Sequence, residues 1–160
     1  MPARIVEDPP PGGLAAVIGL HAGWYARHWG LGLPFEAKVA ADLGAFAQAL
    51  PHPDSRLWLA LEGEAVVGYI AIDGRSPPAA RLRWFIVAEA ARGGLGTRLL
   101  RGALDFCGAR GFAEVELGSF AGLDAARRLY ERHGFVLEEE APARTWGVEL
   151  REQRFRMRIG

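Results

Sequence analysis

The chain has little cysteine, no excess of either charge and no long apolar run. Cys107 is the only cysteine among 160 residues, which excludes a disulfide framework and a cluster of thiolate metal ligands. Lysine plus arginine equals aspartate plus glutamate at 19 each, so no overall field attracts nucleic acid or an anionic membrane. No apolar stretch approaches the ~18 residues of a membrane span. The opening "MPARIVEDPPPGG" also lacks the basic-then-apolar pattern of a signal peptide. We therefore expect a cytoplasmic protein that binds neither nucleic acid nor a membrane.

The size and composition are typical of one globular domain. A chain of 160 residues, half of them apolar and 24% charged, is large enough to bury a core of its own. We predict a single domain over residues 1–160. Cys107 lies in "LDFCGARG", where a small buried residue near a helix end is the expected role in place of a catalytic thiol.

Apolar periodicity and breaks at glycine or proline divide the chain into strands and helices. Helical spacing predicts helices over residues 14–29 and 35–50, a third that ends near Gly108, and a fourth over 123–134. Strand-like runs predict a short strand in 3–7, a hairpin within 56–74 around Glu62-Gly63-Glu64, strands over 81–87 and 112–120, and an extended tail. Gly134 stands where a left-handed helix cap is expected.

The order of these elements predicts a mixed sheet. Three successive strands between residues 56 and 87 predict an antiparallel meander, whereas strand, helix and strand over 81–120 predict a parallel pair with a crossover. Apolar residues change parity along the tail, from Val148 and Leu150 to Phe155, Met157 and Ile159. Because a slip of one residue turns a strand over, we expect a bulge or break near Glu152 and Gln153.

A glycine-rich turn, "ARGGLGT" at residues 91–97, precedes the third helix. A helix N-terminus offers unpaired N–H groups and partial positive charge, and glycines let an anion approach, so a pyrophosphate is the expected ligand. A P-loop is disfavoured because Thr97-Arg98 stands where its Lys-Ser/Thr pair would be. A dinucleotide-binding motif is disfavoured because it would follow the first strand and would have a different glycine spacing. The alternative is a tight turn that binds nothing.

The segments around this turn resemble the GNAT superfamily of N-acetyltransferases. A strand ending in "FIV", the turn with its helix, another strand and then "RRLYERHGF" occur in that family's order and spacing. The resemblance covers most of the chain from Ile5. It implies a mixed α/β fold: a central, mostly antiparallel sheet with helices on both faces and a splayed parallel pair at the acyl-CoA site.

A narrower resemblance is to the acetyltransferase domain often fused behind a MarR-type DNA-binding domain. It is carried by "LHAGWYARHWGLGLPFEAKVA", "ARLRWFIV", "FAGLDAARRLYERHGF" and "TWGVELREQRF". No winged-helix segment precedes these motifs here. We therefore do not expect DNA binding on the basis of this resemblance.

The family resemblance implies acetyl-CoA as co-substrate, without a metal. In the family, the strand backbone and glycine turn hold pantetheine and pyrophosphate, and the later helix supplies a tyrosine beside the thioester sulfur. The implied contacts are Phe85, Ile86, Val87, Arg92, Gly93, Gly94, Leu95, Gly96, Thr97, Leu123 and Tyr130. Two departures stand out: one residue instead of two separates Arg92 from Gly94, and Leu123 replaces a frequent asparagine.

Acyl transfer from a thioester to an amine needs a neutral amine, a polarised carbonyl and a proton for the leaving thiolate. A lysine-like amine with a pKa near 10.4 costs about 4.6 kcal/mol to deprotonate at pH 7, so a base or a water relay matters. A phenol can reprotonate the thiolate. The resemblance gives Tyr130 this role, and the alternative is a tyrosine that only packs beneath the sheet.

The first two predicted helices supply candidates for the acceptor site. His21, Tyr25 and Trp29 share one helix face, and polar groups on such a face are either satisfied core residues or pocket lining. We predict a pocket for a small ligand. His28 lies about 10 Å along the axis from His21, too far to share a metal ion. Glu36 either stabilises a helix dipole or serves as catalytic base or amine ligand.

Two further charged residues complete the predicted acceptor site. Arg83 lies in a strand that should be central, where charge is unusual unless one face lines a cleft. It is expected to hold an acceptor carboxylate or to pair with Glu36 or Glu152. Glu152 is a second candidate base.

These observations predict an acyltransferase that moves an acetyl group from acetyl-CoA to a primary amine of a small molecule. The amine would attack directly in a ternary complex, because Cys107 is poorly placed to form a covalent intermediate. The alternatives are a non-catalytic module that senses acyl-CoA or a metabolite, and a protein N-acetyltransferase, which needs an open groove. A homodimer is left open.

Overall fold

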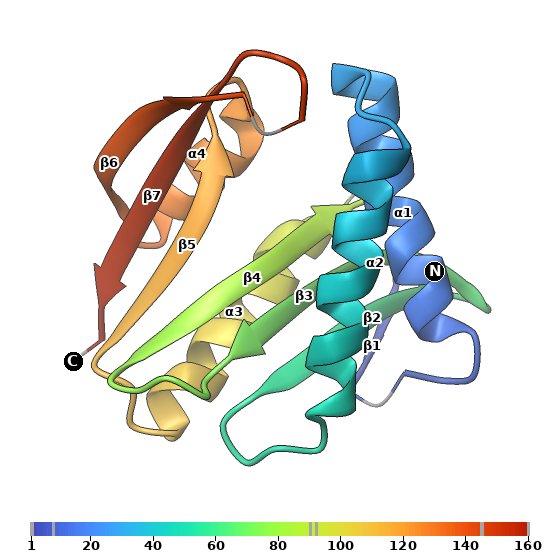
Figure 1. Cartoon of the computed structure of the whole chain (residues 1–160). Coiled ribbons are helices and arrows are strands. Elements are labelled where there is room, and N and C mark those ends of the chain that lie inside the picture. Colours follow the sequence, from blue (N-terminus) through green and yellow to red (C-terminus); the bar gives the residue numbers. More distant parts are fainter. Residues whose placement is uncertain (1, 8, 90, 92, 145, 160) are drawn as a thin grey trace.

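The computed structural model describes residues 2–7, 9–89, 91, 93–144 and 146–159. Its elements are β1 (Arg4–Val6), α1 (Gly13–Trp29), α2 (Leu33–Gln48), β2 (Arg56–Glu62), β3 (Ala65–Asp73), β4 (Ala79–Val87), α3 (Leu95–Ala109), β5 (Glu114–Phe120), α4 (Asp124–Arg132), β6 (Val136–Ala143) and β7 (Leu150–Arg158) (Figure 1). This order confirms the predicted alternation. No helix in the described ranges combines the length and apolarity needed to cross a bilayer.

The described strands form one sheet in the order β1-β2-β3-β4-β5-β7-β6. Strands β2, β3 and β4 form the predicted antiparallel meander, and β4 pairs with β5 in parallel across the α3 crossover. Helices α1 and α2 lie on one face of the sheet, whereas α3 and α4 lie on the other (Figure 1). The mixed α/β fold expected from the sequence is therefore confirmed.

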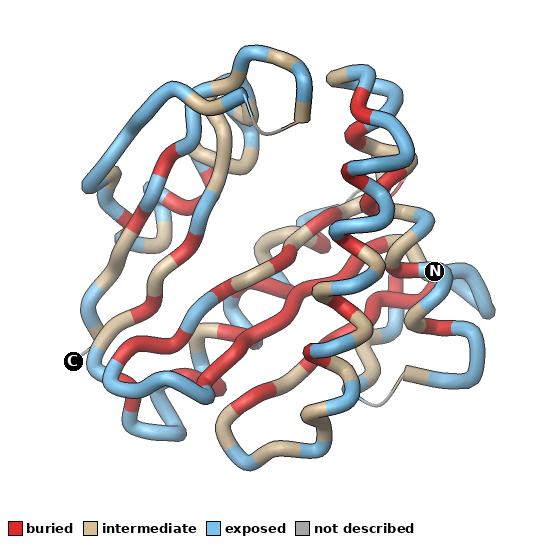
Figure 2. Tube along the Cα trace, viewed as in Figure 1, coloured by how far each residue is buried: buried red, intermediate tan, exposed pale blue. Residues whose placement is uncertain are grey.

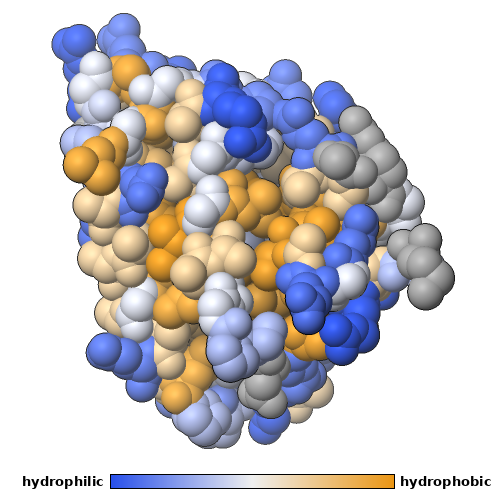
Figure 3. Space-filling model, turned by 90° about the vertical axis from the view of Figure 1, so that its right-hand side faces the viewer, coloured by the Kyte–Doolittle hydropathy of each residue, from blue (hydrophilic) through white to orange (hydrophobic). Residues whose placement is uncertain are grey.

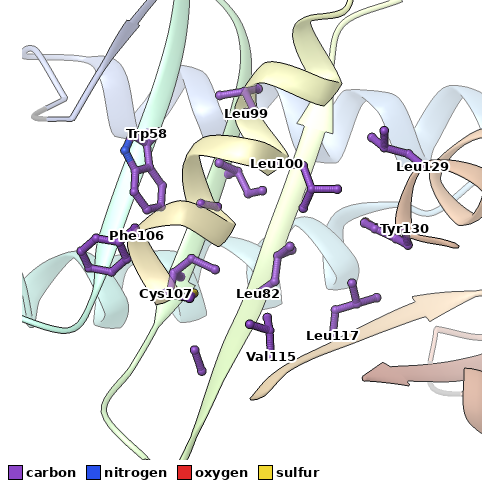
Figure 4. Packing of buried hydrophobic residues seen from close by; sticks show 14 of the residues in the cluster. Trp58, Leu82, Leu99, Leu100, Phe106, Cys107, Val115, Leu117, Leu129 and Tyr130 are labelled. Carbon is purple, nitrogen blue, oxygen red and sulfur yellow. The ribbon is translucent and has the colours of Figure 1, made fainter. Parts of the chain in front are cut away.

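Each face of the sheet carries its own apolar core (Figure 2). Beneath α3, Leu99 and Leu100 pack with strand residues such as Leu82, and α4 adds Tyr130 to the same cluster (Figure 4). Cys107 is fully buried there, and burial raises the pKa of its thiol to about 12. Cys107 is thus the small buried residue that the sequence predicted.

Strands β4 and β5 pair over only part of their length. Their ladder runs from Ala79 opposite Glu114 to Leu82 opposite Leu117. Beyond it, β4 continues to Val87 on β3 alone, and β5 continues to Phe120 on β7 alone. The two strands separate toward their C-terminal ends (Figure 1), which leaves one backbone edge of β4 without a strand partner among the described residues.

The end of α4 and the C-terminal tail test two finer predictions. Gly134 has φ +100° just after α4, as predicted for a left-handed cap. The predicted bulge near Glu152 and Gln153 is wrong: β7 pairs with β5 without a shift, and the irregularity lies in β6 between Leu137 and Glu139. The parity argument failed because Val148 precedes β7 and Leu150 is only its first residue, so neither marks the buried face, which Gln153 and Phe155 form.

On the α1 side of the molecule, apolar residues gather in the middle of the surface and hydrophilic residues surround them (Figure 3). Leu33, at the start of α2, is the more exposed of two large exposed apolar residues in the described ranges, at 75%. The surface is otherwise of mixed polarity, as the even charge balance of the sequence suggests.

Candidate active site

A cavity of about 760 Å³ lies where β4 and β5 separate. Residues 82–87 of β4, 118–120 of β5, both N-terminal helices, α4 and Trp146 line it. This volume is in the range of small-molecule sites. The cavity divides into a strand half, made by Phe85, Ile86, Val87, Gly96 and Tyr130, and a ring half, made by His21, Tyr25, Trp29, Phe35, Phe120 and Trp146.

The strand half presents open backbone. Phe85, Ile86 and Val87 line the cavity beyond the point where pairing with β5 ends. Because a strand carries N–H and C=O groups on both edges, this edge can bond to an extended ligand. The predicted coenzyme residues of β4 are thus on the cavity wall.

The glycine turn borders the strand half. Gly93 and Gly94 have φ +86° and +78°, a left-handed conformation that favours glycine. Gly94 is the N-cap of α3 and has no side chain to cap the first turn, where N–H groups lack intrahelical partners. Among the described residues of the turn, Gly96 lines the cavity.

The other predicted turn residues lie off the cavity wall. Leu95 is buried in the core beneath α3, and neither it nor Gly93, Gly94 or Thr97 is among the described lining residues. Arg92, with its displaced position in the family motif, lies outside the described residues. The contacts expected of these residues therefore stay predictions.

Tyr130 lies in the wall of the strand half, 5% exposed. Its ring packs against Phe85, Phe135 and Phe155, with centroid separations of 6.2, 5.7 and 6.0 Å. Burial, with a smaller contribution from Tyr25, raises the pKa of its phenol above the ordinary value of 10. Tyr130 thus both packs in the core and offers a phenol that stays protonated at neutral pH. Leu123, the N-cap of α4, also lines the cavity.

The ring half is a network of side chains from separate segments. Tyr25 is its centre, with ring centroids 5.0 Å from Phe35 and 6.0 Å from Trp29. Phe120, at the end of β5, lies 5.6 Å from Trp29, and Trp146 lies 5.2 Å from Phe35. The predicted residues His21, Tyr25 and Trp29 therefore lie together on the cavity wall.

His21 forms a buried hydrogen bond with Tyr69. The Tyr69 Oη and His21 Nδ1 atoms are 2.6 Å apart, and burial lowers the pKa of His21 to about 4. Burial also raises the pKa of the Tyr69 phenol well above its ordinary value, so both partners of this hydrogen bond are neutral at neutral pH. His21 is therefore a weak base.

Arg83 lines the cavity, but it pairs with a residue that the sequence did not suggest. Within the described ranges its ion-pair partner is Asp73, at 3.4 Å, and its guanidinium lies 4.4 Å from the Trp84 ring centroid. A hydrogen bond from Arg75 lowers the pKa of Asp73 to about 2. This ion pair replaces the expected pair of Arg83 with Glu36 or Glu152.

The two candidate glutamates lie in different places. Glu152 is exposed, lines the cavity and pairs across the sheet with Phe120. Glu36 is exposed in the first turn of α2 and is not among the described lining residues. Its position suits stabilisation of the helix dipole, which was the alternative to a catalytic role.

Several lining residues were missed by the sequence reasoning. Trp24 and His28 lie on α1, and the His28 Nε2 forms an ion pair with Glu89 after β4. Lys38 and Asp42 lie on α2, 3.0 Å apart. Phe35 and Trp84 were also missed, as were Phe120, at the end of β5, and Trp146, in the loop before β7. Phe120 and Trp146 belong to no periodic pattern that would reveal them.

Comparisons with known proteins give one family and one fold. The model of the acetyltransferase (GNAT) family matches residues 22–135. A similar solved structure is a GNAT-family acetyltransferase from Staphylococcus aureus Mu50, with a TM-score of 0.81 and 16% identity over 99% of each chain. An acetyltransferase from Streptococcus agalactiae matches with a TM-score of 0.79 and 21% identity over 98% of each chain. A ribosomal-protein-alanine N-acetyltransferase from Brucella melitensis matches with a TM-score of 0.75 and 20% identity, covering 98% of this chain and 99% of that chain. No curated protein matches.

Proposed function

We propose that this chain, which belongs to the acetyltransferase (GNAT) family, transfers an acetyl group from acetyl-CoA to a primary amine of a small molecule. One observation carries the proposal: a single cavity joins an open strand edge and the protonated phenol of Tyr130 to a separate ring-lined half. The first half suits the thioester, and the second suits the amine.

The strand half fits the chemistry of acetyl-CoA. Its pantetheine carries amides that can bond to the free edge of β4 at Phe85, Ile86 and Val87. Its pyrophosphate is an anion, which the uncapped N-terminus of α3 and the glycine turn favour. Backbone N–H near Val87 is the candidate for polarising the thioester carbonyl.

The reaction that we propose has no covalent enzyme intermediate. The neutral amine nitrogen attacks the thioester carbonyl carbon, the C–N bond forms and the C–S bond breaks. The departing thiolate takes the phenol proton of Tyr130, and the proton lost by the amine returns to Tyr130 through water. The products are an N-acetylated amine and free CoA. Cys107 takes no part because it is buried in the core, away from the cavity.

The arrangement of the ring half supports a small acceptor over a protein. Its walls come from α1, α2, the end of β5 and Trp146, which surround the acceptor side with bulky rings. A protein N-terminus or lysine is the second candidate acceptor, since the Brucella structure of the same fold is a ribosomal-protein-alanine N-acetyltransferase. A non-catalytic sensor of acyl-CoA is the third reading.

The test is release of free thiol from acetyl-CoA in the presence of a panel of small primary amines and of lysine- or alanine-ended peptides. We expect thiol release with at least one small amine and formation of the acetylated amine by mass spectrometry. Transfer to peptides alone would favour the protein acceptor. Binding of acetyl-CoA by calorimetry without transfer to any acceptor would favour the sensor.

A further inference from the structure

We infer that the acceptor is a primary alkylamine that bears a flat aromatic ring, and that this ring binds in the ring half; the inference rests on the proposed function. The aromatic content of the wall is the first observation. Four of the five tryptophans of the chain, Trp24, Trp29, Trp84 and Trp146, line the cavity. The other tryptophan, Trp58, lies in the opposite core.

The orientation of the rings is the second observation. Tyr25 and Phe35 are tilted by 45°, Tyr25 and Trp29 by 68°, and Phe35 and Trp146 by 88°. The rings of the wall therefore stand at several angles to one another. A flat ring can stack on the faces and meet the edges in a T-shaped contact, whereas a puckered aliphatic ring makes only van der Waals contacts.

The charges around the cavity are the third observation. The acidic residues among its described lining are Asp42, Asp124 and Glu152, and none of them is buried. Asp42 already pairs with Lys38. A polycationic amine would lose hydration here without gaining a buried carboxylate partner.

The same surroundings favour the neutral, reactive form of a primary amine that bears an aromatic ring. Burial against apolar rings disfavours an ammonium group and lowers its pKa. Lys38 and Arg83, the lysine and arginine of the described lining, are each paired with an aspartate, so burial is the main effect on the pKa of the bound amine. An amine with an apolar body gains contact area with the rings and is also more readily deprotonated. A hydrophilic amine gains no such contact area and is only more readily deprotonated.

The test compares three amines: 2-phenylethylamine, 2-cyclohexylethylamine and spermidine. The first two share their carbon number and differ in the flatness of the ring. With saturating acetyl-CoA, we expect kcat/KM to be about tenfold higher for 2-phenylethylamine than for 2-cyclohexylethylamine, and lower still for spermidine. Trp146→Leu should reduce the preference for the flat ring to less than about threefold, with the KM for acetyl-CoA unchanged.

Tryptophan fluorescence gives a readout that does not need turnover. In a Trp58→Phe background the remaining tryptophans all line the cavity, so 2-phenylethylamine should change the emission at lower concentration than 2-cyclohexylethylamine. Preferential binding without thiol release from any amine would support the ligand class and overturn the proposed function. Best transfer to spermidine would overturn the inference and leave the proposed function standing. Equal behaviour of the two ring amines in both assays would also overturn it.

Discussion

The strand half and the ring half of the cavity are made of different parts of the polypeptide. The strand half offers the backbone edge of β4, and the glycine turn and the start of α3 border it. The ring half offers side chains from the adjacent helices α1 and α2, from the end of β5 and from the loop before β7. Backbone groups suit a ligand that stays the same, such as a coenzyme, whereas side chains can change with the acceptor. Substitutions in the two halves should therefore affect different substrates.

Substitution of Tyr130, in the strand half, should give the largest effect. Tyr130→Phe removes the acid but keeps the ring that packs against Phe155. We expect kcat to fall about 100-fold or more, while the affinity for acetyl-CoA by calorimetry and the melting temperature change little. An unchanged kcat with normal coenzyme binding would show that Tyr130 is not the acid.

The buried imidazole of His21, in the ring half, should make the free energy of unfolding depend on pH. In the unfolded chain it binds a proton near pH 6.5, but in the folded protein only near pH 4. The unfolded state therefore binds more protons between these values, and the free energy of unfolding falls as the pH drops below 6.5. The loss should reach about 2 kcal/mol by pH 5.

Urea unfolding at pH 7.5 and pH 5 measures this loss. His21→Leu should remove it, whereas His52→Gln, in the loop before β2, should keep it. An equal pH dependence in wild type and His21→Leu would contradict the burial of a neutral imidazole.

Phe120→Ala should raise the KM for the amine without changing the KM for acetyl-CoA appreciably. Phe120 contacts Trp29 and Tyr25 across the ring half, so its loss removes aromatic contact area from the acceptor. We expect the KM for the amine to rise about tenfold and the KM for acetyl-CoA to stay within about twofold, measured by steady-state thiol release. A rise confined to acetyl-CoA would reverse the assignment of the halves.

Gly94→Ala is the corresponding change in the strand half, with the smallest expected effect. A side chain at φ +78° costs about 1 kcal/mol of stability. The altered turn should also weaken acetyl-CoA binding about fivefold, with the KM for the amine unchanged. The matched control is Gly102→Ala in α3, where a Cβ meets nothing within 4 Å, so stability should hold or rise. Equal effects of the two substitutions on stability and on acetyl-CoA affinity would show that the glycine turn has no special role.

The two halves also differed in how far the sequence predicted them. The strand half follows from local patterns: a strand, a glycine turn, a helix and "LYERHGF" occupy consecutive segments. Of the ring half, only His21, Tyr25 and Trp29 were predicted, because they share one face of α1. Phe120 and Trp146 join them through the sheet topology, which brings the end of β5 and the segment before β7 beside the first helices.

Local pattern also misled the reasoning where tertiary structure decided the outcome. Val148 and Leu150 share one parity and the buried residues of β7 have the other, yet β7 pairs with β5 without a shift and the irregularity lies in β6. Arg83 was expected to hold an acceptor carboxylate or to pair with Glu36 or Glu152. Its ion-pair partner in the described ranges is Asp73, at the end of β3, and the carboxylate role stays a prediction. Pairings across a sheet depend on register, which hydrophobic spacing alone does not fix.

Titration of acetyl-CoA into the protein in a calorimeter tests directly whether the strand half is a coenzyme site. The free edge of β4, the glycine turn and Tyr130 together predict saturable binding of one acetyl-CoA per chain, weakened by Gly94→Ala and little changed by Phe120→Ala. The absence of saturable binding to the folded protein, or equal weakening by both substitutions, would contradict the division of the cavity into a coenzyme half and an acceptor half.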